Sequence, residues 1–279
     1  MFGRRPSRDQ IPTAPEPPAA PTVQPVEPAR KSFYLGGYRA LTSLYTGHKI
    51  FVDTRDVGIA PHLLWEGRWE PWIDGHVVDA VKPGMVVCDV GANFGYYTLL
   101  MAEKVGQSGH VHAFEPNPRV ANLLRQSVAV NGFASRTTVH ELALGDTEAE
   151  LSLHVDEASM GGGYVTIEPT GLPVRCRRLD DVLGADARID FLKVDVEGAE
   201  DAVLRGAEQI LGGASLQGAL IEIARGIASS EPPAAMRPFL EKGMSATALE
   251  PQGPVPIVGG AWPEALAAGT LFNILFHAT

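Results

Sequence analysis

Apolar and polar positions follow two different spacings along the chain from residue 85 onward. Short apolar runs, such as residues 85–90 and 190–194, indicate buried strands. Residues 96–105 and 119–131 instead repeat their apolar positions at the spacing of an amphipathic helix. Strands that alternate with helices of this length predict an α/β fold, in which helices cover both faces of a mostly parallel sheet.

The same spacings assign the remaining segments. Further strands are expected at residues 49–53, 111–114, 137–142, 151–155 (the start of a hairpin), 219–223 and 271–276, and further helices at residues 199–211 and 236–242. Helical spacing also runs through residues 60–81, but Gly67, Pro71 and Gly75 interrupt it. We therefore expect two short helices in that stretch rather than one.

The beginning of the chain differs in composition, because residues 1–32 are dense in proline. Proline lacks an amide hydrogen and fixes φ, so such a segment cannot build helices or sheet ladders. We expect a disordered, proline-rich tail at residues 1–32, a cap of strand and short helices at 33–84, and the main domain at 85–279. A solvated extension is the favoured interpretation of the tail, and a docking segment for a partner or an anionic surface is the alternative.

Charge and cysteine content narrow the class of partner. The formal net charge of -10 disfavours nucleic acid, because an acidic protein repels phosphate backbones. Neutral or amine-bearing partners are easier to accommodate. Cys88 and Cys176 stand alone, so neither a disulfide framework nor a zinc site is indicated. Without a long apolar run or a secretory signal, we expect no transmembrane segment and a cytoplasmic protein.

The first strand of the main domain leads into the loop Asp89-Val90-Gly91-Ala92-Asn93-Phe94-Gly95, and a helix follows it. Gly91 and Gly95 allow a sharp turn and a close approach of a ligand to the backbone. Such a loop can hold a dinucleotide diphosphate or the amino-acid end of S-adenosylmethionine. The dinucleotide fingerprint requires a glycine where Asn93 stands, and Asp89 would repel a diphosphate but attract an ammonium group. The competing interpretation is that Asp89 only satisfies loop amides.

The next two strand ends supply candidates for the rest of a nucleoside. Glu115 can accept both ribose hydroxyls, a role that NAD enzymes share. Asn117 followed by Pro118 predicts the cap of the next helix, which leaves Glu115 free. After the third strand, the amide near Ala143 or the carboxylate of Asp146 can contact the adenine, and an ordinary loop is an equally good interpretation.

Charged residues gather at the end of the fourth strand. Lys193 lies inside an apolar strand and requires a carboxylate partner. Asp195 is placed to stabilise a bound sulfonium and to orient or deprotonate an acceptor hydroxyl. Glu197 and Glu200 begin the next helix, where acids also favour the dipole, and we prefer that role for Glu200.

The fifth strand adds Glu222, which interrupts an apolar run. We expect it to point into the cleft or to pair with Lys193 or Arg225. Asp195 and Glu222 alone are too few hard ligands to predict a metal site, so no metal is expected.

Three tryptophans precede the main domain, at Trp65, Trp69 and Trp72, with Glu70 among them. Their rings can stack on a sugar or macrolide. The favoured interpretation is a helix packed over the core.

The main domain resembles the FkbM family of class I methyltransferases. The matching segments are VCDVGANFGYYT at residues 87–98, AFEPNP at 113–118 and, most specifically, LKVDVEGAE at 192–200. The similarity runs roughly from residue 52 to residue 276. It implies a Rossmann-like fold with a seven-stranded sheet whose last strand is antiparallel, and S-adenosylmethionine as the methyl donor.

The resemblance also implies methylation of a hydroxyl on a sugar, a glycan or glycolipid, or a polyketide-type acceptor. The donor site would comprise Asp89, Gly91, Ala92, Asn93, Gly95, Tyr97, Glu115, Pro116, Ala143, Asp146 and Asp195. The catalytic group would comprise Asp195, Glu197, Lys193 and Glu222. Two rival functions are retained: an NAD(P)-dependent oxidoreductase, and a donor-binding scaffold without turnover that acts through its tail.

Overall fold

The computed structural model describes residues 31–156, 159–166, 168, 170–223, 236–258 and 272–278. Almost all of the proline-rich tail and Arg225 lie outside these residues. The expectations for them are therefore not tested by the structure.

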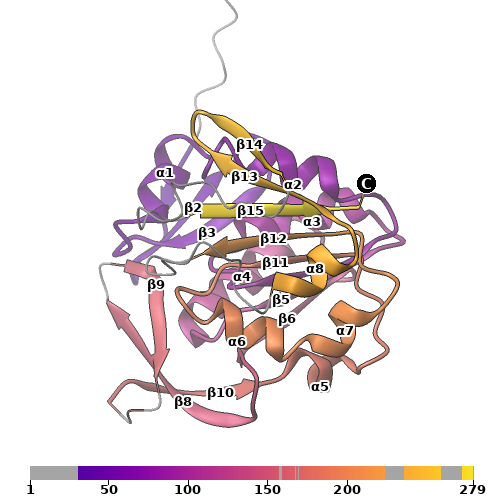
Figure 1. Ribbon diagram of the computed structural model, residues 1–279. Helices are drawn as coiled ribbons and strands as arrows, with labels where there is room; N and C mark the ends of the chain where they lie inside the picture. The colour runs from indigo at the N-terminus through magenta and orange to yellow at the C-terminus, as the bar shows by residue number, and fades with distance from the viewer. Residues whose placement is uncertain are drawn as a thin grey trace, which may run out of the picture.

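The main sheet contains eight strands in the described part of the chain (Figure 1), in the order β14-β13-β15-β12-β11-β4-β5-β6. Their bounds are β4 Val86–Val90, β5 His110–Phe114, β6 Thr137–His140, β11 Phe191–Val194, β12 Gly218–Ile223, β13 Ser245–Glu250, β14 Gly253–Ile257 and β15 Phe272–His277. Strands β6, β5, β4, β11 and β12 run parallel, and β15 inserts antiparallel between β12 and β13. This agrees with the expected mostly parallel sheet and its antiparallel last strand.

The sheet has one strand more than the seven expected, because β14 is added at its edge. Gly253, at φ 131°, allows the chain to turn back so that β14 pairs antiparallel with β13. The strand carries Pro254 and Pro256, which remove backbone donors and restrict such a strand to an edge. These prolines also conceal the strand in the sequence.

Helices cover both faces of the main sheet. On one face lie α3 (Tyr96–Val105) and α4 (Pro118–Val130), and on the other lie α5 (Leu179–Leu183), α6 (Glu200–Arg205), α7 (Glu208–Gly212) and α8 (Arg237–Glu241). The single helix expected at residues 199–211 is wrong, because the chain breaks at Gly206 between α6 and α7. A Cβ at Gly206 would lie 1.9 Å from the carbonyl oxygen of Gly145, so this close approach requires glycine.

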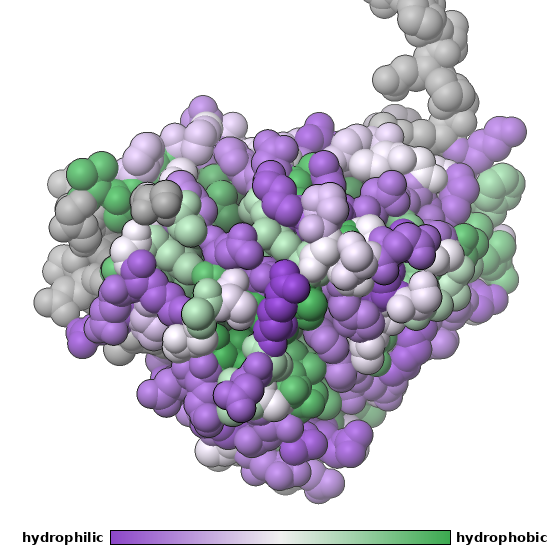
Figure 2. Space-filling view, turned by 90° about the vertical axis from the view of Figure 1, so that its right-hand side faces the viewer, coloured by the Kyte–Doolittle hydropathy of each residue, from purple (hydrophilic) through white to green (hydrophobic). Residues whose placement is uncertain are grey.

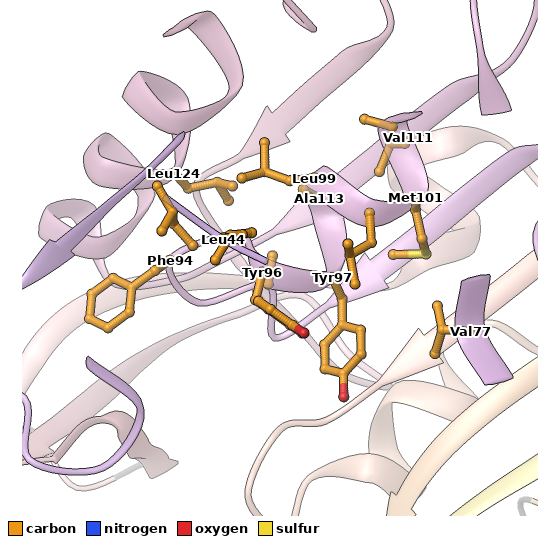
Figure 3. Packing of buried hydrophobic residues seen from close by; sticks show 14 of the residues in the cluster. Leu44, Val77, Phe94, Tyr96, Tyr97, Leu99, Met101, Val111, Ala113 and Leu124 are labelled. Carbon is orange, nitrogen blue, oxygen red and sulfur yellow. The ribbon is translucent and has the colours of Figure 1, made fainter. Parts of the chain in front are cut away.

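Helix α3 lies inside the core, where its residues pack among buried aliphatic side chains (Figure 3). Leu99, Met101 and Leu124 are almost fully buried, as is Phe94 just before the helix. At the start of α4, the side chain of Asn117 accepts a hydrogen bond from the amide of Arg119 (3.0 Å), which confirms the predicted cap. Both helices therefore begin at fixed positions beside the ends of β4 and β5.

The residues before β4 form a small sheet and two short helices. They comprise β1 (Phe33–Tyr34), β2 (Arg39–Ser43), β3 (Lys49–Asp53), α1 (Ile59–Trp65) and α2 (Asp74–Ala80). The amide of Phe51 donates to Ser127 Oγ (2.9 Å), and Arg119 forms an ion pair with the buried Asp53. These contacts attach the small sheet to α4.

A second small sheet follows β6, in the order β7-β10-β8-β9. It contains β7 (Ala143–Leu144), β8 (Ala149–Asp156), β9 (Ser159–Thr166) and β10 (Leu172–Arg177), and β8 and β9 form the expected hairpin. In Figure 1 this hairpin lies at the left, beyond the arrowhead of β12. The opposite side of the molecule, which faces the viewer in Figure 2, is mostly hydrophilic.

Candidate functional site

A cavity of about 270 Å³ opens at the carboxyl ends of the parallel strands. It lies where the chain, having built β4, β5 and β6 toward one edge, crosses to build β11 and β12 on the other side of β4. Parallel α/β sheets bind ligands at such a reversal of strand order.

Two walls face each other across this cavity. The strand-end wall follows β4, β5 and β6 and consists of Gly91–Phe94, Phe114–Asn117 and Leu142–Leu144. The cap–hairpin wall consists of Trp69 and Glu70 from the α1–α2 connection and Leu153, Val155, Gly163 and Val165 from the β8–β9 hairpin. Lys193, Asp195, Glu197 and Glu222 line the cavity between the two walls.

The loop after β4 is held by its own backbone conformation. Gly91, Asn93 and Gly95 have φ values of 76°, 51° and 99°, and Asn93 Oδ1 accepts a hydrogen bond from the amide of Phe94 (2.7 Å). A Cβ at Gly91 would lie only 1.8 Å from the carbonyl oxygen of Asp195. Glycine is therefore required at Gly91 because the loop lies directly against the end of β11.

Asp89 lies behind this loop and does not line the cavity. It is fully buried, and Thr98 Oγ1 donates to Asp89 Oδ2 (2.5 Å). Its other oxygen, Oδ1, accepts no hydrogen bond and lies 3.7 Å from Lys193 Nζ. Burial raises the pKa of Asp89 above its usual value. The carboxylate of Asp89 therefore faces Thr98 and the ammonium group of Lys193 rather than the cavity.

Glu115 connects the strand-end wall to the loop. Its Oε2 accepts a hydrogen bond from the amide of Asn93 (3.0 Å), and its Oε1 accepts one from the amide of Asn117 (2.9 Å). Burial raises the pKa of Glu115 to about 7. Each carboxylate oxygen has two lone pairs, so each can accept one further hydrogen bond from a ligand in the cavity.

Lys193 has the carboxylate partner that its burial requires. Its Nζ lies 2.9 Å from Asp195 Oδ2, and the side chain is 3% exposed. Burial alone would lower the pKa of the ammonium group, but Asp195 and Asp89 raise it above its ordinary value. Lys193 therefore remains charged, and its charge is neutralised by carboxylates.

Asp195 and Glu222 form a pair of carboxyl groups that both line the cavity. They are hydrogen-bonded, and burial together with the charge of Asp195 raises the pKa of Glu222 far above its usual range. Burial would also raise the pKa of Asp195, but Lys193 outweighs it and lowers this pKa. Glu222 is thus the protonated partner, while the side chain of Asp195 stays ionised and is 29% exposed toward the cavity.

Some of the site residues predicted from the sequence line the cavity, and others lie outside it. Ala143, Pro116, Tyr97 and Glu197 line the cavity, whereas Gly95, Glu200 and Asp146 do not. Gly95 instead packs against Leu124, where a Cβ would lie 2.4 Å from Cδ1. Glu200 accepts a hydrogen bond from the amide of Gly198 (2.9 Å), consistent with a structural role. The carboxylate of Asp146 forms an ion pair with Arg205 (3.0 Å), which directs it away from the expected adenine contact.

The cap–hairpin wall contains Glu70, for which the sequence predicts no role, and Trp69, for which packing over the core is favoured above stacking on an acceptor. Trp69 lines the cavity, whereas Trp65 is 87% exposed, so the interpretation that the tryptophans pack over the core is wrong for Trp65. Glu70 also lines the cavity and accepts a hydrogen bond from Tyr97 Oη (3.0 Å). The sequence marks Glu70 only as an acidic residue among tryptophans. No local motif links it to the main domain.

The donor set fits a cationic nucleoside better than a dinucleotide. Of the described residues that line the cavity, Lys193 alone has a basic side chain, and Asp195 already neutralises it. Glu115, Asp195 and the buried Asp89 would repel a diphosphate but stabilise a sulfonium and an ammonium group. No group of three or more His, Cys, Asp or Glu in the described ranges could hold a metal ion, and no helix there is long and apolar enough to cross a membrane.

The strand order and this cavity together define a Rossmann-like, class I methyltransferase fold. Residues 89–242, more than half of the chain, match the family model described as the methyltransferase FkbM domain. The chain belongs to this FkbM family of S-adenosylmethionine-dependent methyltransferases.

The chain is also similar to individual proteins. It is 30% identical to Methyltransferase 1 of Beauveria bassiana over 44% of this chain and 58% of that protein. It is 32% identical to the 31-O-demethyl-FK506 methyltransferase FkbM of Streptomyces tacrolimicus over 46% and 61%, respectively. The matches therefore span only about three fifths of these relatives. A solved structure, methyltransferase FkbM from Methylobacillus flagellatus, is 22% identical over 50% of this chain and 32% of that chain, with a TM-score of 0.38.

Proposed function

We propose that the protein transfers a methyl group from S-adenosylmethionine to a hydroxyl oxygen of a sugar, a glycan or glycolipid, or a polyketide-type acceptor. The observation that carries this proposal is the anionic cavity, in which a glycine-rich loop and Glu115 face Asp195 without a free basic side chain. The printed name of the Streptomyces relative, an O-demethyl-FK506 methyltransferase, supports an oxygen of a polyketide-type molecule as one acceptor class.

In this proposal the strand-end wall holds the donor. The loop from Gly91 to Asn93 contacts its methionine end, Glu115 accepts the ribose hydroxyls beside Pro116, and the backbone at Ala143 borders the adenine. When bound, S-adenosylmethionine supplies an electrophilic methyl group on a positively charged sulfur. Because the donor is already reactive, the protein mainly aligns the two reactants and excludes water.

Asp195 and its partners act at the reacting end of the cavity. The ionised carboxylate of Asp195 stabilises the cationic donor and orients the acceptor hydroxyl. Lys193 and the protonated Glu222 both donate hydrogen bonds to Asp195, so they fix its direction and charge. Glu197, at φ 52°, also lines the cavity and is exposed to solvent, so it can contact the acceptor.

The charge of the cavity also restricts the acceptor. An anionic acceptor would meet Asp195, Glu197 and Glu70 without a free cation to compensate its charge. Neutral or amine-bearing acceptors avoid this repulsion. We further propose that residues 33–84 form a cap that completes the main domain (residues 85–279), that the acceptor is not a nucleic acid, and that the protein is cytoplasmic.

Calorimetry on the purified protein tests the donor assignment. S-adenosylmethionine and S-adenosylhomocysteine should bind, and NADH and NADPH should not, because their diphosphates face three carboxylates. Tight NAD(P)H binding with no affinity for either sulfur nucleoside would instead favour the oxidoreductase.

A donor with a deuterated methyl group tests turnover. The labelled methyl should appear by mass spectrometry on one of three probes: methyl α-glucopyranoside, a neutral glycolipid or a hydroxylated macrolactone. Donor binding without transfer to any of them would favour the scaffold protein.

A further inference from the structure

Glu70 lies in a segment outside the residues that match the family model. It belongs to the connection between α1 and α2, 19 positions before the matched range of 89–242 begins. Despite this distance in sequence, Glu70 lines the same cavity as Asp195 and the glycine loop. The fold therefore brings a carboxyl group from the cap to the reacting end of the site.

The backbone at Glu70 is in a conformation that only a few residues adopt. Its φ is 44°, in the left-handed region that disfavours residues with a Cβ. The amides of Ile73 (2.8 Å) and Asp74 (3.2 Å) both donate to the carbonyl oxygen of Glu70 and hold the turn. Such strained residues concentrate at functional sites, where the surrounding structure maintains them.

The side chain of Glu70 is held at the cavity by its neighbours. Tyr97 Oη donates to Glu70 Oε2 (3.0 Å), and the Trp69 side chain donates a second hydrogen bond. Figure 3 shows the hydroxyl of Tyr97 pointing away from the packed aliphatic side chains around α3. Lys193 Nζ lies 4.9 Å from the centre of the Tyr97 ring, so Tyr97 lies between Glu70 and the charged centre at Asp195.

We propose that Glu70 is the general base that accepts the proton of the acceptor hydroxyl, an inference that rests on the proposed methyl transfer. The acceptor O–H bond breaks, and its proton passes to a carboxylate oxygen of Glu70. The acceptor oxygen forms a bond to the methyl carbon, while the carbon–sulfur bond breaks and leaves its electron pair on sulfur. The products are the methyl ether, S-adenosylhomocysteine and protonated Glu70, which returns its proton to solvent.

Asp195 is less suited to this step than Glu70. Both Lys193 and Glu222 donate to Asp195, and Lys193 lowers its pKa, so Asp195 is a weak base. Burial and the nearby charge of Asp195 raise the pKa of Glu70 to about 7, where a general base is effective at neutral pH. The expectation that Asp195 deprotonates the acceptor is thus replaced by an orienting role, and Tyr97 is a positioning residue for Glu70.

The test combines Glu70→Gln with Glu70→Asp in the full chain. Glu70→Gln should lower kcat by about 100-fold or more on the probe that accepts the deuterated methyl, because general-base catalysis is lost. Its Kd for S-adenosylhomocysteine and its Tm should stay at the wild-type values. Glu70→Asp retains a carboxylate and should recover part of kcat. Glu66→Gln, in the same segment but half exposed and outside the cavity, should match the wild type and is the control.

The pH dependence separates a base from a structural residue. The wild-type kcat should fall as the pH drops below about 7, because Glu70 becomes protonated, and this limb should be absent in Glu70→Gln. Tyr97→Phe removes a hydrogen bond that lowers the pKa of Glu70, so the limb should move to higher pH. Infrared difference spectra of wild type against Glu70→Gln, which require no acceptor, should show one carboxyl that titrates in the same range.

Two outcomes would overturn the proposal. One is Glu70→Gln with wild-type kcat and an unchanged acidic limb on a working acceptor, which would leave the methyltransferase function intact. The other is an infrared difference spectrum in which no carboxyl titrates near neutral pH. Failure of the methyltransferase proposal itself would look different, as wild-type protein that binds neither sulfur nucleoside.

Discussion

The two walls of the cavity are built in opposite ways. The strand-end wall comes from three consecutive strand–loop units, and its polar groups bond to each other: Glu115 holds the amides of Asn93 and Asn117. The cap–hairpin wall comes from two segments on either side of these units in sequence, and most of its lining residues are apolar, such as Val155 and Val165. One wall is fixed by local hydrogen bonds, and the other by packing between distant segments.

This difference bears on what each wall recognises. A donor that is the same throughout a family needs a wall whose geometry a short motif can specify. An acceptor that varies needs a surface whose shape can change without disturbing that motif. Substitutions in the strand-end wall should therefore affect folding and donor binding, and substitutions in the cap–hairpin wall should affect the acceptor alone.

The largest effect is expected at Lys193, which lies between the walls. Lys193→Met keeps the length of the side chain but leaves Asp89 and Asp195 without their cation, which should lower the free energy of unfolding by about 3–5 kcal/mol. Urea unfolding without donor measures this loss. Lys82→Met, which removes an exposed lysine, is the matched control.

The loss at Lys193→Met should also depend on pH. Without the ammonium group, the folded-state pKa values of both aspartates rise above their unfolded values. A group with a raised pKa loses stability as the pH rises through the folded-state value, so the deficit should be larger at about pH 8 than at about pH 5. A deficit that is equal at the two pH values would mean that the carboxylates are compensated by another group.

The second effect is expected at Gly91. Gly91→Ala places a Cβ 1.8 Å from the carbonyl oxygen of Asp195 at a φ of 76°, so the loop must move away from β11. Left-handed backbone strain and overpacking together should lower the free energy of unfolding by about 2–4 kcal/mol. They should also abolish donor binding. Gly47→Ala has a similar φ of 90° with no atom near the new Cβ, so it isolates the strain term. Equal losses in the two variants, by urea unfolding, would show that the contact with β11 is unimportant.

The third effect is expected at Glu115 and concerns donor binding alone. Glu115→Gln replaces an acceptor oxygen by an NH₂ group, which faces a backbone amide and cannot accept a ribose hydroxyl. Affinity for S-adenosylhomocysteine should fall by about 10- to 100-fold, as expected for hydrogen bonds to a charged group. Calorimetry measures it, with Glu141→Gln as the control because that carboxylate pairs with Arg125 outside the cavity. Unchanged affinity in Glu115→Gln would remove Glu115 from the donor site.

The contrast between the walls also explains how much the sequence predicts. The alternating strands, the glycine loop and the Asn117 cap follow from spacing within a few residues, and the structure contains all of them. The same local reasoning fails where the structure of a segment depends on residues far away in sequence. Gly206, where the helix is interrupted, packs directly against the carbonyl of Gly145, and the prolines of β14 occupy a sheet edge that only the complete sheet defines.

The residues of the site also divide into those that local spacing predicts and those that distant contacts determine. Lys193 and its need for a carboxylate are evident from one charged residue in an apolar strand. Asp146 has the spacing of an adenine contact, but Arg205, 59 residues away in sequence, binds its carboxylate instead. Glu70 has no motif to mark it, because its partner Tyr97 is 27 residues away and belongs to another part of the fold. Spacing predicts what neighbouring residues do together, whereas the cap–hairpin wall depends on how separate segments of the chain meet.

The smallest effect is expected for a substitution in the β8–β9 hairpin. It tests most directly whether the two walls bind different reactants. Val165→Ala on β9 removes two methyl groups from a half-buried, cavity-lining side chain, which corresponds to about 0.5–1 kcal/mol of contact with an apolar part of the acceptor. The acceptor KM should rise about two- to fivefold, with kcat and the Kd for S-adenosylhomocysteine unchanged. Tyr164→Phe, on the neighbouring exposed residue stacked against His154, is the control. If Val165→Ala weakened donor binding as much as acceptor binding, the two walls would act as one surface, and the division of labour proposed for them would be wrong.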